Sequence, residues 1–499
     1  MNVNWLVPLF IAMYFTILIV ISYLTGKKAG NDAFFVGERK SPWYIVAYGM
    51  IGASLSGVTF ISIPGWVGKT GFHYFQMVLG YIVGYYVIAY VLMPVYYRLN
   101  VISIYSYLKE RFGNSSYKIG SLYFLLSRLI GASFRLYLVA IVLELVFEQM
   151  GFEVPFFITV IVTVLLIWIY TNKGGIKTII WTDTLQTTFM LAALVLTVLS
   201  IKESLAIDWS TVWVEINAAG YADWLNFSDS SRADYAVKYF VSGAFIAIAM
   251  TGLDQDMMQK NLSCKNLKEA RWNMISFAWI LVVVNALFLL LGAMLYLYAA
   301  KNGLLIPEKT DYLFPQIALS GDLGLVVMIC FVLGLIASAY SSADSALTAL
   351  TTSFSLDILE IDKKSSEEEA LLTRRKVHIG MSVLIILLIL LFRILNNDSV
   401  VSNLFKAAGY TYGPLLGLFS FGLITRYSVK DKWVPLVAIL SPILTYLVQL
   451  LSGRIFPEFE IGFEIILLNA LLSFAGLLLL RNGEFKKQIN NANSNKISL

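Results

Sequence analysis

Long apolar runs follow one another along most of this 499-residue chain, separated by short polar stretches. A helix needs about 20 apolar residues to cross the hydrocarbon core of a bilayer. About thirteen runs approach that length, so the pattern predicts an all-α polytopic membrane protein. We expect the spans at residues 5–25, 45–67, 74–97, 119–147, 154–171, 180–201, 236–252, 272–299, 323–355, 377–395, 399–425, 433–452 and 461–480.

The composition supports lipid as the solvent of this chain. Hydrophobic residues make up 58% of it and charged residues only 14%, whereas soluble domains carry about 25% charged residues. The net charge of +5 does not indicate nucleic-acid binding, because no basic patch interleaved with aromatics lies in a soluble domain. The first span lacks a basic leading segment, so we do not expect a cleaved signal peptide.

The basic residues predict the topology, because cytoplasmic loops collect Lys and Arg. With alternating loops, 26 basic residues lie on one side, 8 on the other and 3 within spans, which together are the 37 of the chain. Thirteen spans then place the N-terminus outside and the C-terminus in the cytoplasm of a multi-pass protein of the cell membrane. We expect residues 1–480 to form a single transmembrane domain and residues 481–499 a short cytoplasmic tail.

Two spans combine glycines and hydroxyls in a way that a space-filling membrane helix does not need. The run Tyr48–Phe60 contains three glycines with Ser54, Ser56 and Thr59 near its middle. Irregular backbone at membrane depth is tolerated only where protein or water covers it. A local unwinding here would turn carbonyls toward a cation, although close helix packing through small residues is an equal alternative.

The run Gly334–Ser353 places serines at helical spacing, with Asp344 one turn beyond Ser341. Hard cations prefer oxygen ligands, and an ionisable residue inside a membrane is a functional candidate by default. The alternative is polar packing with the aspartate paired to a basic residue. Span 119–147 carries Arg128 and Arg135, two turns apart on one face. We expect them to meet a carboxylate, a cavity or an anionic solute, with Asp344, Asp183 and Glu144 as candidate partners.

Four segments are informative together: Ile169–Ile176 with Ile180–Asp183, the broken run at 45–67, the stretch Asp254–Lys260, and the serine-rich run that ends at Asp357. Together they resemble the sodium/solute symporter family, which includes sodium–sugar, sodium–proline and sodium–sialic acid carriers. The resemblance implies a leucine-transporter-like inverted five-plus-five repeat. Span 1 is then extra, the regions 45–252 and 236–425 hold the two repeats, and residues 433–480 hold two terminal helices.

The resemblance also implies a sodium site. By position its ligands are the carbonyls of Gly52, Leu55 and Ser338 and the hydroxyls of Ser341 and Ser342. Some family members bind a second sodium, and the matching positions are Asp183, Ser341, Asp344 and Ser345. Asp344 departs from the family there, which has a hydroxyl. The extra carboxylate could strengthen the site, bind a proton or pair with Arg135.

The family's solute contacts map onto a third set of positions, although the sequence does not identify the solute. They are Ser56, Thr59, Phe60, Tyr81, Arg135 and Tyr410, with Tyr412 as an alternative to the last.

The resulting expectation is a sodium-coupled symporter that imports a small polar solute, a sugar or an organic anion, by alternating access. The only partners expected are sodium, the solute and the bilayer, with no resident cofactor, nucleic acid or evident protein partner. A proton-coupled carrier on the same scaffold is the alternative. An enzyme is not expected, because His73 and His378 lie apart from any catalytic constellation. A sensor is not expected either, because the tail is too short for a signalling domain.

Overall fold

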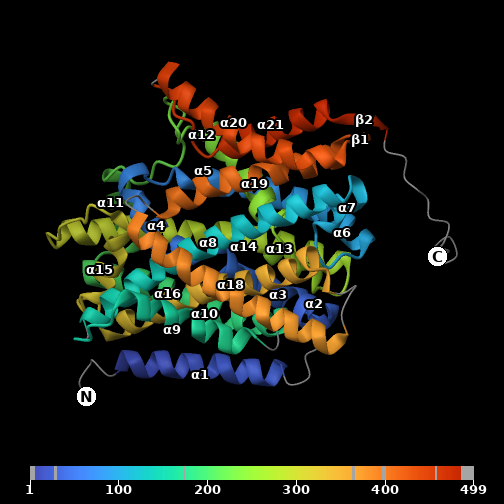
Figure 1. Cartoon of the computed structure of the whole chain (residues 1–499). Helices are drawn as coiled ribbons and strands as arrows, with labels where there is room; N and C mark the ends of the chain where they lie inside the picture. The colour runs from blue at the N-terminus through green and yellow to red at the C-terminus, as the bar shows by residue number, and fades with distance from the viewer. Residues whose placement is uncertain are drawn as a thin grey trace.

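The computed structural model describes residues 6–26, 31–149, 151–172, 175–361, 366–395, 400–455 and 458–484. Residues 485–499 of the expected tail lie outside this part, as do Lys173 and Gly174 of the segment Ile169–Ile176. Within it, helices account for nearly the whole chain (Figure 1).

The elements are bounded as follows: α1 Leu6–Gly26, α2 Asn31–Val36, η2 Gly37–Arg39, α3 Trp43–Ser54, α4 Gly57–Thr70, α5 Tyr74–Val87, η3 Ile88–Leu92, α6 Met93–Leu99, α7 Ser106–Arg111, α8 Asn114–Gln149, α9 Phe156–Thr171, α10 Ile176–Leu205, α11 Trp209–Ala218, α12 Ala236–Ala247, η4 Ile248–Gly252, α13 Gln255–Leu262, α14 Leu267–Lys301, η5 Thr310–Tyr312, α15 Leu313–Leu319, α16 Leu325–Ser353, η6 Phe354–Ile358, α18 Glu367–Leu395, α19 Val400–Ile424, β1 Tyr427–Val429, η7 Asp431–Trp433, α20 Val434–Ile455, α21 Ile465–Leu479 and β2 Arg481–Glu484. The two short strands pair antiparallel.

Each of the thirteen predicted spans coincides with a helix or with a bent pair of helices. In the described part of the chain, nine helices are long and apolar enough to cross a membrane, or up to eleven if each bent pair counts as one span. Two apolar helices, α9 and α21, are shorter than that. The prediction of an all-α polytopic membrane protein is therefore confirmed, whereas the count of thirteen stays a prediction.

The outer helices present apolar side chains outward, as a lipid solvent requires. In Figure 1, α1 lies along one outer edge of the molecule, and α20 and α21 lie along the opposite edge. On α20 the exposed positions are almost all large and aliphatic: Leu436, Ile439, Leu440, Ile443, Leu444 and Leu447. Exposing apolar surface to water costs about 25 cal/mol for each Å². This face is therefore suited to the hydrocarbon core of a bilayer.

Two segments are broken helices, and the first is the run at 45–67 in which an unwinding was predicted. Helices α3 and α4 meet at 56°, and the α12–η4 segment meets α13 at 65°. At the first break Ser56 is extended, with φ −70° and ψ 175°, so the helical hydrogen-bond ladder stops. At the second, the Asp254 carboxylate accepts hydrogen bonds from the backbone N–H groups of Asp256 and Met257. Each break leaves helix-terminal carbonyls and N–H groups near the middle of the bundle.

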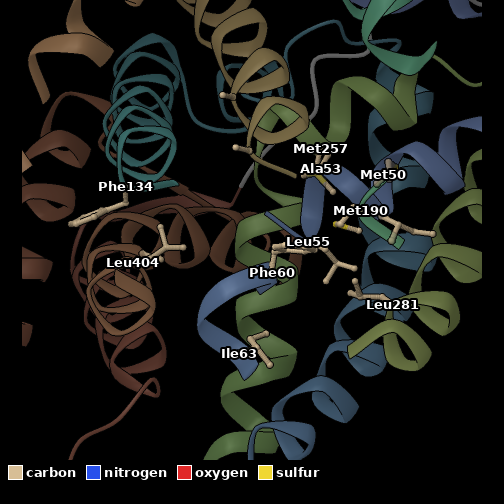
Figure 2. Close-up of a cluster of buried hydrophobic side chains, with 14 of the residues drawn as sticks. Met50, Ala53, Leu55, Phe60, Ile63, Phe134, Met190, Met257, Leu281 and Leu404 are labelled. Atoms are coloured by element: carbon tan, nitrogen blue, oxygen red, sulfur yellow. The ribbon is translucent and has the colours of Figure 1, made fainter. Parts of the chain in front are cut away.

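Apolar side chains hold the first break in place. Figure 2 shows Met50, Ala53 and Leu55 at the break with Met190 and Met257 nearby, and all five are buried. Gly52 brings α3 against α10 and α16, because a Cβ atom there would collide with Thr187 Oγ1 and approach Ser341 Oγ to 3.3 Å. The expected small-residue packing and the expected unwinding therefore occur in the same segment.

Two other helices also meet backbone to backbone. A Cβ atom on Gly80 of α5 would collide with the carbonyl oxygen of Phe240, and one on Gly243 of α12 would collide with that of Met77. Glycine at these positions lets α5 and α12 approach more closely than any side chain permits.

We predict that Gly52→Ala lowers the free energy of unfolding by about 1–3 kcal/mol, because the added methyl group overpacks the contact with Thr187. Thermal melting of the detergent-purified protein measures the effect. Gly380→Ala in α18 is the matched control, since an added Cβ there meets nothing within 4 Å in the described part of the chain. Thr187→Ala combined with Gly52→Ala should recover part of the loss. An unchanged melting temperature in Gly52→Ala would contradict the packing argument.

Candidate functional site

The serines of α16 face the first break. Ser342 Oγ donates a hydrogen bond to the carbonyl oxygen of Ala53 at 3.1 Å and lies 3.3 Å from that of Ser338. Ser341 Oγ approaches α3 at Gly52. All of these groups are buried. Carbonyl and hydroxyl oxygens from two helices thus converge on one buried place, which is the ligand type that hard cations prefer.

Of the positions predicted for the sodium site, Gly52, Ser338, Ser341 and Ser342 lie together, with one difference of detail. The carbonyl that accepts from Ser342 is that of Ala53, between the predicted Gly52 and Leu55. Ser338 Oγ itself bonds within α16, to Leu335, so only its carbonyl faces Ser342. Among the described residues, no cluster of three or more His, Cys, Asp or Glu side chains could hold a metal ion. A cation here would depend on neutral oxygens.

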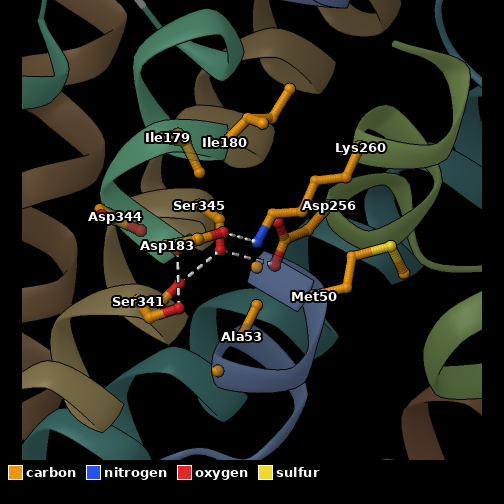
Figure 3. A network of polar contacts seen from close by, with 12 residues as sticks. Met50, Ala53, Ile179, Ile180, Asp183, Asp256, Lys260, Ser341, Asp344 and Ser345 are labelled. Atoms are coloured by element: carbon orange, nitrogen blue, oxygen red, sulfur yellow. Dashed lines mark hydrogen bonds and ion pairs between the residues drawn. The ribbon is translucent and has the colours of Figure 1, made fainter. Parts of the chain in front are cut away.

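A second polar group lies beside the first, around Asp183 of α10 (Figure 3). Its Oδ1 accepts a hydrogen bond from Ser341 Oγ at 2.7 Å. Its Oδ2 lies 2.6 Å from Lys260 Nζ. Ser345 Oγ donates to the carbonyl of Ser341 at 2.8 Å and lies 3.3 Å from Asp256 Oδ2.

Lys260 is the residue of this group that the sequence analysis placed wrongly. It was counted among the basic residues of the cytoplasmic loops, but its side chain is 1% exposed and paired with Asp183. The error arose because span 236–252 was ended at Gly252, whereas the chain turns at Asp254 and continues as α13. A signal was available in the sequence, since Lys260 closes the polar stretch Asp254–Lys260, one of the segments that carries the family resemblance.

Asp344 does not pair with Arg135. Its Oδ2 accepts a hydrogen bond from the Tyr170 hydroxyl of α9 at 2.8 Å. Its Oδ1 is buried and has no hydrogen-bond partner among the described residues. Of the three possibilities predicted for Asp344, pairing with Arg135 is therefore excluded. Binding an ion and binding a proton remain.

Arg128 and Arg135 share one face of α8, as predicted, but their surroundings differ. Arg128 forms ion pairs with Asp254 and Asp256 at the second break. The Tyr412 hydroxyl donates to Asp254 as well. Arg135 is 7% exposed, and its Nε and Nη1 have no hydrogen-bond partner in the described part of the chain.

The partners predicted for the two arginines are thus wrong. Asp183 pairs with Lys260, Asp344 bonds to Tyr170, and Glu144 forms an ion pair with Arg393 at 3.1 Å. Spacing along one helix shows which side chains share a face, but it does not show which residues distant in the sequence lie opposite them.

A central cavity joins the two breaks. Its polar lining comes from the α3–α4 break, α5, α8, η4 and α14: Ser54, Ser56, Thr59, Tyr74, Tyr81, Tyr85, Arg128, Arg135, Thr251 and Asn285. Four of the predicted solute residues, Ser56, Thr59, Tyr81 and Arg135, are in this lining.

The structure places Phe60 and Tyr410 away from the lining. Phe60 packs against the rings of Phe314 and Phe331, and the Tyr410 hydroxyl donates to Gln449.

Tyr74, Tyr85 and Asn285 also line the cavity, although they were not predicted from the sequence. The Tyr74 hydroxyl lies 3.1 Å from that of Tyr81. Helical spacing could have found the tyrosines, because positions 74, 81 and 85 lie on one face of α5. Nothing in the sequence distinguishes Asn285 from other polar residues of a buried helix.

A family model for the sodium:solute symporter family matches residues 34–430. The chain belongs to the sodium:solute symporter family. Among its curated relatives in this family are the sodium/sialic acid symporters of Aliivibrio fischeri, at 26% identity over 86% of this chain and 85% of that protein, and of Proteus mirabilis, at 25% identity over 82% of each. The predicted family membership is confirmed, and the chain is a sodium-coupled symporter of a small solute in a membrane.

Two solved structures are similar in fold to this chain. A Na+-coupled sialic acid symporter in a substrate-bound, outward-open state has a TM-score of 0.81 at 21% identity, covering 96% of this chain and 97% of that one. A nucleobase-cation-symport-1 family transporter in a closed conformation has a TM-score of 0.56 at 15% identity over 90% and 93%. These likenesses confirm the predicted leucine-transporter-like fold.

The buried ion pairs of Arg128 should contribute strongly to the stability of this symporter. Arg128→Met leaves Asp254 and Asp256 without their cation, and we expect a loss of about 3–5 kcal/mol, as for other broken buried ion pairs. Arg393→Met is the matched control, because its pair with Glu144 is partly exposed and such pairs contribute about 0–1 kcal/mol. Thermal melting in detergent compares the two variants. Equal losses would contradict the ion pairing described for Arg128.

Proposed function

We propose that this symporter imports a small organic anion and that Arg135 receives the anionic group. The observation that carries the proposal is the buried guanidinium that faces the central cavity with two unpartnered nitrogens. An unpaired charge at membrane depth costs free energy. A carboxylate offers two oxygens in the geometry that a guanidinium fork matches, so a bound anion would remove that cost.

The relatives support an anionic solute. Two are sodium/sialic acid symporters, a sodium-coupled monocarboxylate transporter of Mus musculus is 27% identical over 81% of this chain, and a human sodium/iodide cotransporter is 24% identical over 80%. All of these names describe anions. The hydroxyls of Ser56, Thr59 and Tyr81 would bind the remaining polar groups of the solute.

In this proposal sodium binds between the first break and α16, with ligands from Gly52, Leu55, Ser338, Ser341 and Ser342. Because these oxygens belong to two elements, the ion joins them and shapes the cavity wall at Ser56. Sodium and solute then raise each other's affinity by equal factors. An inward gradient drives the cycle, with a membrane potential adding about 2.3 kcal/mol per charge per 100 mV.

We also propose the arrangement of the repeats and the membrane topology that the sequence predicts. The two repeats span regions 45–252 and 236–425, the N-terminus lies outside the plasma membrane and the C-terminus in the cytoplasm. The chain acts as a carrier, without a catalytic step and without an obligate protein partner.

Sodium should raise the melting temperature of the purified protein when it replaces choline at constant pH, and Ser342→Ala should remove most of that response. The reason is that the substitution deletes one oxygen ligand of the proposed site. Ser382→Ala is the matched control, because Ser382 donates within α18 to His378 and lies outside the site. Stabilisation by acid alone, with none by sodium, would favour the proton-coupled carrier instead.

Arg135→Met should abolish sodium-dependent uptake of an anionic solute in proteoliposomes, and Arg135→Lys should raise KM at least about tenfold, because an ammonium lacks the bidentate fork. Labelled sialic acid and a short monocarboxylate are the first solutes to test, with a neutral sugar beside them. Arg393→Met controls for a lost surface charge. Sodium-dependent uptake of the neutral sugar with none of either acid would contradict the assignment of Arg135.

A further inference from the structure

The ammonium of Lys260 lies inside the group of residues that matches the family's second sodium site. Its Nζ is 2.6 Å from Asp183 Oδ2, and both side chains are 1% exposed. Lys260 lies on α13, beyond the second break, whereas Asp183 lies on α10. A pair this deeply buried persists because separating it would leave a charge without compensation.

Both oxygens of Asp183 are already engaged. Oδ2 binds the ammonium of Lys260, and Oδ1 accepts the proton of Ser341 Oγ at 2.7 Å. A metal ion that used Asp183 as a ligand would have to displace the ammonium or lie directly beside it. Two cations on one carboxylate repel each other strongly where the surroundings are buried.

The other residues of this group are partly occupied. Ser345 Oγ donates to the Ser341 carbonyl or to Asp256. Asp344 accepts from Tyr170 through Oδ2, while its Oδ1 has no hydrogen-bond partner among the described residues. Asp256 in turn is paired with Arg128. In Figure 3 the side chains of Lys260 and Asp256, both on α13, meet Asp183 from the opposite side.

We propose that the Lys260 ammonium permanently fills the second cation position, so that this symporter binds one sodium ion, at the Ser341 and Ser342 site. The inference rests on the proposed function and specifies its ion stoichiometry. The second positive charge belongs to the protein and is never exchanged with the solution.

The same contacts give Asp183 a positioning role at the remaining sodium site. A serine hydroxyl can donate its proton in one direction and offer its lone pairs in another. Because Asp183 takes the proton of Ser341, the lone pairs of that hydroxyl are free to face a cation at the first break. Lys260 holds the carboxylate in the orientation that this requires.

Equilibrium binding of radioactive sodium to the purified full chain in lipid nanodiscs tests the proposal, with choline as the replacing cation. We expect the wild type to saturate at one sodium per chain and Ser342→Ala to lose it. Lys260→Gln removes the ammonium and leaves Asp183 free, so binding should rise to two. Lys260→Arg retains a cation and should stay at one. Asp183→Asn combined with Lys260→Gln should return to one.

Two sodium ions bound to the wild type would overturn the proposal, as would a folded Lys260→Gln variant that still saturates at one. Should Lys260→Gln not fold, the wild-type and Lys260→Arg counts decide, with one sodium in each supporting the proposal and two in either overturning it. The absence of any saturable sodium in the wild type is a different result. It would contradict the sodium site of the proposed function rather than its stoichiometry.

Discussion

The cost of an uncompensated charge away from water governs the centre of this molecule. Four buried aspartates, Asp183, Asp254, Asp256 and Asp344, and three buried cations, Arg128, Arg135 and Lys260, lie there on α8, α10, α13 and α16, with Asp254 as the N-cap of α13. Each needs a counter-charge or a hydrogen-bond partner within the protein. The short helix α13 provides two of these counter-charges. Its Lys260 binds Asp183 of α10, and its Asp256 binds Arg128 of α8. The second break exists where this helix begins, because only a turn at Asp254 lets these side chains reach inward.

The same constraint separates the groups that hold the fold from those left for ligands. Arg128 has its carboxylates, and Lys260 has its carboxylate, so both contribute to the resting structure. Arg135 Nε and Nη1 lack a hydrogen-bond partner among the described residues, and the oxygens at the first break are hydroxyls and carbonyls without a charge of their own. Leu55 and Ser56 line the cavity together with Arg135, and they directly follow Ala53, whose carbonyl accepts from Ser342. A site that needs both an anion and a cation therefore has its two halves joined by one extended segment of backbone.

The sequence predicted the helices and the unwinding in span 45–67, because both depend on local composition. It did not predict the break at Asp254, which lies beyond the predicted span 236–252. Apolar length defines a span, and glycine with hydroxyl residues marks where a span is interrupted. It also placed Ser341, Ser342 and Arg135 near the centre, partly through the family resemblance. The sequence did not predict which buried charged residues pair with one another. Asp183 with Lys260 is a contact between residues 77 positions apart, and no periodicity within either helix identifies it. The burial of Lys260 was missed for the same reason, since a lysine after an apolar run is normally a loop residue.

The glycine contacts between α5 and α12 have a mechanical consequence. At Gly80 and Gly243 the carbonyl oxygens of one helix lie where the other helix would carry side chains. Sliding either helix along the other would drive backbone into backbone, so the pair can move only as one rigid body. Helix α12 leads through η4 into the second break, and α5 carries the cavity tyrosines. Any rocking of α12 therefore carries Tyr81 and Tyr85 with it, and the hinge of such a motion must lie at Leu253 and Asp254 rather than between the two helices.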